Sequence, residues 1–146
     1  MNLSIPIAIG VGGFVGALAR YYVSGAVVRA AGEDYSFAGT LTVNLIGCFV
    51  IGILTAVAAR SDSFSDVMQK CLITGLLGSL TTFSTFGLDS LNLLKDGRVG
   101  AAVTNVGVNV AAGLLLVWIG MITADRFFPG SETDPARNTP EQQTDR

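Results

Sequence analysis

One stretch of the chain combines residue types that are unusual in an apolar sequence. Gly75 to Phe86 reads GLLGSLTTFSTF, which contains two glycines, five hydroxyl side chains and two phenylalanines. Phe83 and Phe86 are three residues apart, so both rings lie on one face of a helix. Polar, irregular backbone at membrane depth is tolerated only where it is buried in protein or lines a water-filled path. The stretch therefore indicates the functional centre of a membrane protein.

Neutral polar side chains also occur in the neighbouring apolar segments. Thr40 and Asn44 are four residues apart and share a helical face, as do Asn105 and Asn109. Such groups supply N–H and O–H donors that can replace part of an anion's hydration shell, and the edges of aromatic rings are electropositive. Conduction requires binding weak enough for release, and no Asp or Glu lies near the middle of an apolar segment. These residues favour a small, strongly hydrated anion over a cation or an organic solute.

Two of the polar residues have two interpretations each. Asn44 needs partners in hydrocarbon, and either an interhelical hydrogen bond or an amide donor facing a path would supply them. Arg20 costs at least ~2.5 kcal/mol inside a span, so it lies at an interface, in a vestibule or on helix-end carbonyls. It serves either as a structural anchor or as a group that attracts anions.

The composition and the apolar segments indicate how these residues are positioned. The 146-residue chain is 50% hydrophobic and 14% charged, whereas a soluble domain carries about 25% charged residues. Four apolar segments approach the ~20 residues that a bilayer core requires. They predict an all-α integral membrane protein with transmembrane helices at about 4–28, 37–59, 67–94 and 99–123. The third segment exceeds a straight span, so we expect its helix to be broken at the midplane, near Leu80.

The remaining sequence describes the frame of the molecule. Gly12 and Gly16 form a small-xxx-small pair, which lets another helix approach closely. Residues 1–124 are predicted to form the transmembrane domain. Residues 125–146 are polar and rich in proline, so we expect a disordered tail.

The cations near the helix ends give no preferred orientation in the membrane. Three fall on each side, so the positive-inside rule provides no bias. Four spans are also too few to enclose a wide cavity. Both points suggest an antiparallel homodimer with its axis in the membrane plane. The cations are Arg60, Lys70 and Arg126 on one side and Arg29, Lys95 and Arg98 on the other.

Several classes of function are disfavoured. The chain has no histidine, no nucleophile–base pair, no carboxylate pair and no phosphate-binding glycine loop, so we predict that it is not an enzyme. It has no basic patch, so we expect no nucleic-acid partner. Cys48 and Cys71 are interpreted as small buried apolar residues. A broken helix does expose carbonyls, and these could hold a bare cation.

Four sets of residues resemble a known family. They are GGxxGAxxRY at 12–21, GTxxVNLIG at 39–47, GxxGSLTTFSTF at 75–86 and NVxVN at 105–109. Over about residues 5–124 the chain resembles the Fluc (CrcB) fluoride channels. The TTFSTF run combined with VNLIG at this spacing is highly specific.

The resemblance implies a dual-topology antiparallel dimer with two fluoride pores and one central Na+. The Na+ ligands would be the backbone carbonyls of Gly78 and Thr81 from both subunits. Each pore would take its phenylalanines from different subunits, and Arg20 would be a vestibule or structural residue. The implied pore residues are Phe83, Phe86, Asn44, Thr82, Ser84 and Asn109.

The resemblance also implies passive export of fluoride through the plasma (inner) membrane of a prokaryote. A negative-inside potential drives a monovalent anion outward by ~2.3 kcal/mol per 100 mV. Two positions depart from the family pattern: Gly113 replaces a hydroxyl residue and Asp89 replaces a glutamate. A dual-topology small-molecule exporter and a membrane scaffold without transport activity are the alternatives. The exporter would need a carboxylate in an early span, which the sequence lacks.

Overall fold

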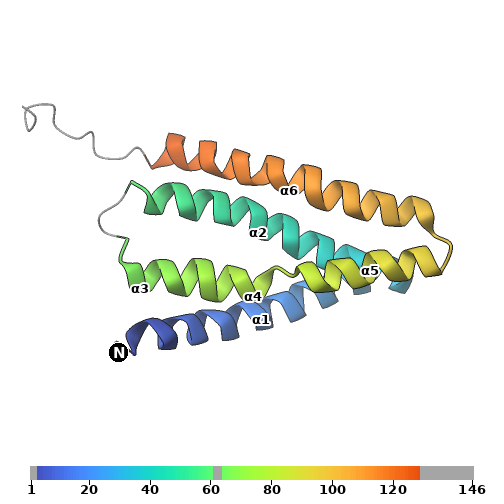
Figure 1. The fold of residues 1–146 in the computed structure, drawn as a ribbon, viewed down its shortest axis with the longest axis horizontal. Coiled ribbons are helices and arrows are strands. Elements are labelled where there is room, and N and C mark those ends of the chain that lie inside the picture. The colour runs from blue at the N-terminus through green and yellow to red at the C-terminus, as the bar shows by residue number, and fades with distance from the viewer. Residues whose placement is uncertain (1–2, 61–63, 129–146) are drawn as a thin grey trace, which may run out of the picture.

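The computed structural model describes residues 3–60 and 64–128, and this part of the chain is organised by four long helical segments (Figure 1). All four are long and apolar enough to cross a membrane. This confirms the prediction of an all-α chain with four membrane-length helices. Three segments are continuous helices: α1 (Ser4–Ala31), α2 (Phe37–Ala58) and α6 (Val99–Phe127). The third consists of α3 (Asp66–Gln69), the π-helix η2 (Lys70–Leu77), α4 (Gly78–Leu80) and α5 (Phe83–Lys95), and the short 3₁₀-helix η1 (Glu33–Tyr35) joins α1 to α2.

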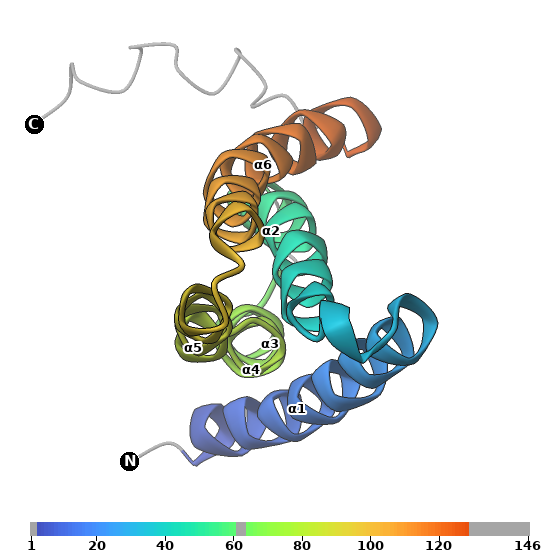
Figure 2. The ribbon, with the colours of Figure 1, turned by 90° about the vertical axis from the view of Figure 1, so that its right-hand side faces the viewer.

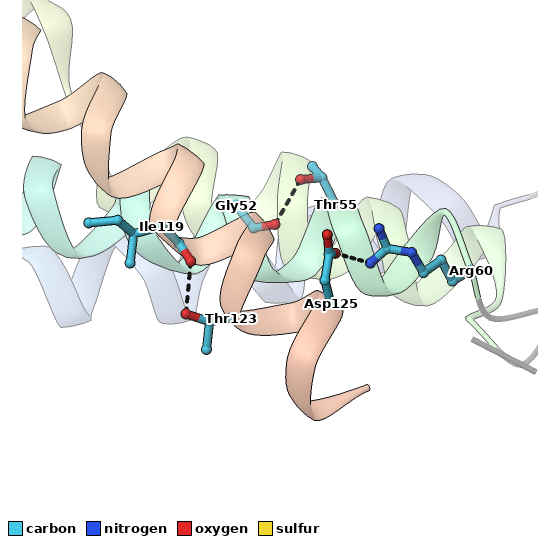
Figure 3. Close-up of polar contacts among 6 residues, drawn as sticks. All are labelled: Gly52, Thr55, Arg60, Ile119, Thr123 and Asp125. Carbon is cyan, nitrogen blue, oxygen red and sulfur yellow. Dashed lines mark hydrogen bonds and ion pairs between the residues drawn. The ribbon is translucent and has the colours of Figure 1, made fainter. Parts of the chain in front are cut away.

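The helices extend further than predicted at two ends. α1 continues to Ala31. Arg29 lies in its last turn, where a positive charge interacts favourably with the negative end of the helix dipole and stabilises the helix. α6 continues to Phe127, beyond the predicted end of the helix at about residue 123. Its last turns are tied to the end of α2 by an ion pair between Arg60 and Asp125 (Figure 3). Residues 129–146 of the predicted tail lie outside the described part of the chain.

The three continuous helices cover the third segment on one side only. α2 packs along α6, and α1 packs along η2 and α4. Viewed along the bundle, α6, α2 and α1 form an arc, with α3, α4 and α5 on its concave side (Figure 2). Among the described residues, no helix covers α5 on its outer side in this view. The third segment is therefore supported from one direction and open in the other.

Glycines allow α1 and η2 to touch through their backbones. A Cβ atom on Gly12 would lie 2.1 Å from the carbonyl oxygen of Cys71, and one on Gly16 would lie 2.1 Å from that of Leu76. The contact is reciprocal, because a Cβ atom on Gly75 would lie 2.6 Å from the carbonyl oxygen of Ile9. The prediction that Gly12 and Gly16 admit a close helix is confirmed. This contact determines how closely the third segment packs against α1.

A second arginine links helical segments at the end of the bundle opposite the Arg60–Asp125 pair. The guanidinium of Arg98 donates a 2.6 Å hydrogen bond to the carbonyl of Asp34 and lies 5.9 Å from the centre of the Tyr35 ring. It joins η1 to the start of α6. Between the two ends, Val43, Leu77 and Leu80 form the buried apolar core.

Candidate functional site

Two residues of extended backbone separate α4 from α5. Thr81 has φ −85° and ψ 155°, and Thr82 has φ −152° and ψ 118°. The N–H and hydroxyl groups of Thr81 both donate to the carbonyl of Leu77, at 3.0 and 2.9 Å. The hydroxyl of Thr82 accepts from the N–H of Thr85 at 3.3 Å and so caps the start of α5. The helix can end and restart here because side-chain oxygens satisfy part of the interrupted backbone.

Asn44 on α2 satisfies both backbone polar groups of Thr82. Its Oδ1 accepts from the N–H of Thr82 at 2.9 Å, and its Nδ2 donates to the carbonyl of Thr82 at 3.3 Å. The same Nδ2 donates to Oδ1 of Asn109 on α6 at 3.1 Å. Of the two interpretations of Asn44, the structure contains the interhelical hydrogen bond. The amide thereby joins three helical segments at one point.

Because of the interruption, the carbonyls of Gly78 and Thr81 lose the N–H groups that would bond them in a helix. In a continuous helix, the N–H of Thr82 would bond the carbonyl of Gly78, and that of Thr85 would bond the carbonyl of Thr81. These N–H groups donate instead to Asn44 Oδ1 and to the Thr82 hydroxyl. Gly78 and Thr81 are the two positions whose carbonyls were predicted to bind Na+. Both carbonyls thus lack their helical donors, and Gly78 is exposed.

A pocket of about 350 Å³ opens beside the extended residues. None of the described residues that line it carries a charged side chain; its polar groups are neutral amides and hydroxyls. The pocket therefore offers neutral polar groups and no full counter-charge, and the Nδ2 groups of Asn44 and Asn109 are bonded within the protein. The lining residues are Asn44, Gly47, Cys48, Ile51, Ile73, Leu77, Gly78, Thr81, Thr82, Phe83, Phe86, Asn109 and Val110.

Phe83 and Phe86 contact each other at the start of α5. Their ring centres are 5.5 Å apart, and the ring planes are inclined by 56°. Phe86 is buried, whereas Phe83 is 84% exposed. The pair therefore extends from the interior of the pocket, at Phe86, to the protein surface, at Phe83 on the uncovered side of α5.

The structure brings most of the predicted site residues together around this pocket. Gly78 and Thr81 line it, as do five of the six predicted pore residues. The sixth, Ser84, lies outside the described lining, and its hydroxyl is 3.3 Å from that of Thr82. Arg20 is half-buried on α1, and α1 contributes no residue to the described lining. Their roles toward ions stay predictions.

Comparison with known proteins identifies the family. The family described as CrcB-like protein, Camphor Resistance (CrcB), matches residues 7–121. The chain is 42% identical over 122 residues to "Fluoride-specific ion channel FluC" of Hydrogenovibrio crunogenus, covering 84% of this chain and 92% of the relative. A FluC of Methylobacillus flagellatus is 43% identical over 113 residues (77% and 88%), and one of Trichlorobacter lovleyi is 44% identical over 108 residues (74% and 86%). The chain belongs to the CrcB family. Its relatives carry the name of ion channels, not of enzymes.

In this CrcB protein the two departures noted in the sequence have different surroundings. Gly113 lies on α6 facing α2, and a Cβ atom there would be 3.3 Å from Cys48 Sγ. Asp89 lies one turn beyond Phe86, and its Oδ2 is buried without a hydrogen-bond partner among the described residues. Neither residue belongs to the described lining of the pocket.

The structure adds site residues that the sequence analysis did not assign. Gly47 and Cys48 line the pocket from α2, one helical turn beyond Asn44. A Cβ atom on Gly47 would lie 2.2 Å from the Cγ2 methyl of Thr81, so only glycine leaves room for Thr81 in this conformation. The VNLIG motif contained this signal, because Gly47 lies three residues after Asn44 and shares its helical face.

The contact between Gly47 and Thr81 gives a prediction about stability. Gly47→Ala should lower the temperature at which the detergent-solubilised protein loses its size-exclusion peak, because overpacking costs ~1–3 kcal/mol. Adding Thr81→Ser removes the clashing methyl and keeps the hydroxyl, so the double variant should recover most of the loss. Gly87→Ala is the matched control, since nothing lies within 4 Å of its Cβ position. A double variant no more stable than Gly47→Ala alone would contradict this packing.

Proposed function

We propose that this chain is a fluoride-specific ion channel that passively exports F− across the plasma (inner) membrane of a prokaryote. The observation that carries the proposal is the uncharged pocket beside Thr81 and Thr82, lined by amide and hydroxyl groups and two phenylalanine rings. Family membership supports it, because the relatives compared above are named as fluoride-specific channels. The proposal extends that printed name to this chain.

The pocket suits a small anion that must also leave. Thr82, Asn44 and Asn109 provide neutral polar groups, and the edge of each phenylalanine ring is electropositive. A lysine or arginine there would hold the anion too strongly for conduction. The direction of flow follows from the potential, which contributes ~2.3 kcal/mol per 100 mV for one charge. No energy source or chemical step is required.

The functional unit in this proposal is an antiparallel homodimer. Phe83 lines the pocket but is 84% exposed in one copy, and it lies at the start of α5, which no described helix covers on its outer side. A second, inverted copy would enclose the ring and bring its own phenylalanines to the pore. The balanced cations at the two ends of the bundle are compatible with insertion in both orientations.

A central Na+ would lie on the axis of this dimer. Its ligands would be the carbonyls of Gly78 and Thr81 from both copies, four oxygens in all. Hard cations prefer oxygen ligands, and the helical donors of these two carbonyls are bonded elsewhere. The ion would add a structural link between the copies at the point where each helix is interrupted.

Fluoride efflux from liposomes tests the proposed function. Vesicles loaded with F− and holding the purified protein should release it after a K+ ionophore dissipates the opposing potential, as recorded with a fluoride electrode. Phe83→Ile should abolish the release while the dimer persists on size exclusion, because an aliphatic side chain has no electropositive edge.

Leu88→Ile is the matched control, since Leu88 is an exposed apolar residue of the same helix. Absence of F− release from well-folded wild-type dimers would refute the channel and favour an exporter or a scaffold. Normal release from Phe83→Ile would refute the role of the ring alone.

Replacement of sodium tests the cation site. Protein extracted, purified and reconstituted in K+ at equal ionic strength should conduct less fluoride than protein kept in Na+. Returning Na+ should restore the rate, because the four carbonyls would regain the smaller ion. An equal rate in both cations, at equal dimer content, would count against a bound Na+ at Gly78 and Thr81.

A further inference from the structure

Asn105 and Ser90 form a buried polar pair behind the pocket. Asn105 on α6 is 1% exposed and Ser90 on α5 is 9% exposed. The Nδ2 of Asn105 donates to the Ser90 hydroxyl at 2.9 Å, and that hydroxyl donates to the carbonyl of Phe86 at 2.8 Å. Buried amide and hydroxyl groups are costly unless bonded, so this pair has a defined geometry. Neither residue lines the pocket in the described structure.

The pair is the end of one continuous series of hydrogen bonds. Nδ2 of Asn109 donates to the carbonyl and to Oδ1 of Asn105, both at 3.0 Å. Asn109 in turn accepts from Asn44, which accepts from the N–H of Thr82. The series thus starts at the backbone before α5, passes through α2 and α6, and returns to α5 at the carbonyl of Phe86. Three of its members, Thr82, Asn44 and Asn109, line the pocket.

The two backbone ends determine the orientation of every amide in between. The N–H of Thr82 can only donate, so Oδ1 of Asn44 must face it and Nδ2 must face Asn109. At the other end, the carbonyl of Phe86 can only accept, so the Ser90 hydroxyl donates to it and presents a lone pair to Asn105. A reversed amide anywhere in the series would place two donors or two acceptors in contact.

We propose that Asn105, held by Ser90, is a positioning residue that fixes the amide orientation of Asn109 and Asn44 for anion conduction. Loss of the Ser90 hydroxyl removes the acceptor for Asn105 and the donor to Phe86. The Nδ2 of Asn105 then has no described acceptor, the Asn105 side chain is held only through its Oδ1 by Asn109, and the Asn109 amide loses part of the support that fixes its orientation. The inference rests on the proposed fluoride conduction, since flux is its readout.

The experiment compares fluoride efflux from liposomes holding equal amounts of dimeric protein. Ser90→Ala should reduce the rate about tenfold, the loss expected when one buried hydrogen bond no longer selects an arrangement. Thr123→Ala is the matched control, because the Thr123 hydroxyl makes the same bond to the carbonyl four residues earlier, that of Ile119, far from the pocket (Figure 3). Its rate should stay within about twofold of wild type.

A second substitution separates positioning from simple packing. Asn109→Ser keeps a hydroxyl at position 109, which can bond only the backbone carbonyl of Asn105, and it removes the amide that joins the Asn105 side chain to Asn44, so it disconnects the series of side chains. In that background Ser90→Ala should change the rate less than about twofold. A further tenfold loss there would mean that Ser90 acts through packing of α5, and it would overturn the proposal.

The outcomes also separate this inference from the proposed function. A wild-type protein without fluoride release would refute the channel itself. A conducting wild type with an equally fast Ser90→Ala variant would refute only the positioning role. A slower Ser90→Ala variant that has lost the dimer peak on size exclusion would also count against it, because the residue would then support assembly.

Discussion

The Asn44 amide and the backbone of Thr82 form the contact on which the rest of the site depends. Backbone N–H and C=O groups at membrane depth must be bonded within the protein. Leaving one such buried group unpaired costs about 1–3 kcal/mol. Asn44 satisfies both polar groups of Thr82 from a neighbouring helix. An interrupted helix is thereby tolerated where a continuous one would otherwise be favoured.

This contact has consequences on both sides of the interruption. On the α4 side, the Thr82 N–H no longer bonds the carbonyl of Gly78, which is left available to a ligand. On the α5 side, the Thr82 hydroxyl caps the new helix and Phe83 starts it at the edge of the pocket. One side-chain amide is thus linked both to the carbonyls of the interruption and to the start of α5 at the pocket.

The packing around the interruption depends on small residues. The hydrophobic effect does not drive helices together in lipid, so close backbone contact and hydrogen bonds must hold the bundle. Gly12 and Gly16 let α1 reach the carbonyls of the π-helix, and Gly47 leaves room for the Thr81 methyl. Each glycine lies beside a backbone or side-chain atom that a Cβ atom would displace.

The sequence was sufficient for the four membrane-length helices, because composition and segment length are local features. The residue types of Gly75–Phe86 indicated the stretch beside the pocket, and the roles of the predicted site residues stay predictions. The sequence did not distinguish the partners of Asn44, since bonds between residues 38 and 65 positions apart depend on how helices pack. Ser90 and the contact between Gly47 and Thr81 were missed for the same reason. The ends of α1 and α6 were placed too early because charged residues were taken as loop, although Arg29 and the Arg60–Asp125 pair stabilise helix ends.

The most direct test of the central claim is fluoride efflux from liposomes that hold Asn44→Ala dimers. Thr55→Ala is the control, because the Thr55 hydroxyl bonds only its own helix: it donates to the carbonyl of Gly52 (Figure 3) and to that of Ile51. If Asn44 supports both the interrupted backbone and the donors of the pocket, Asn44→Ala should lose most of its fluoride conduction while Thr55→Ala keeps it. Conduction by Asn44→Ala at the wild-type rate, with dimers intact, would contradict the account and leave Asn44 as a link between helices alone.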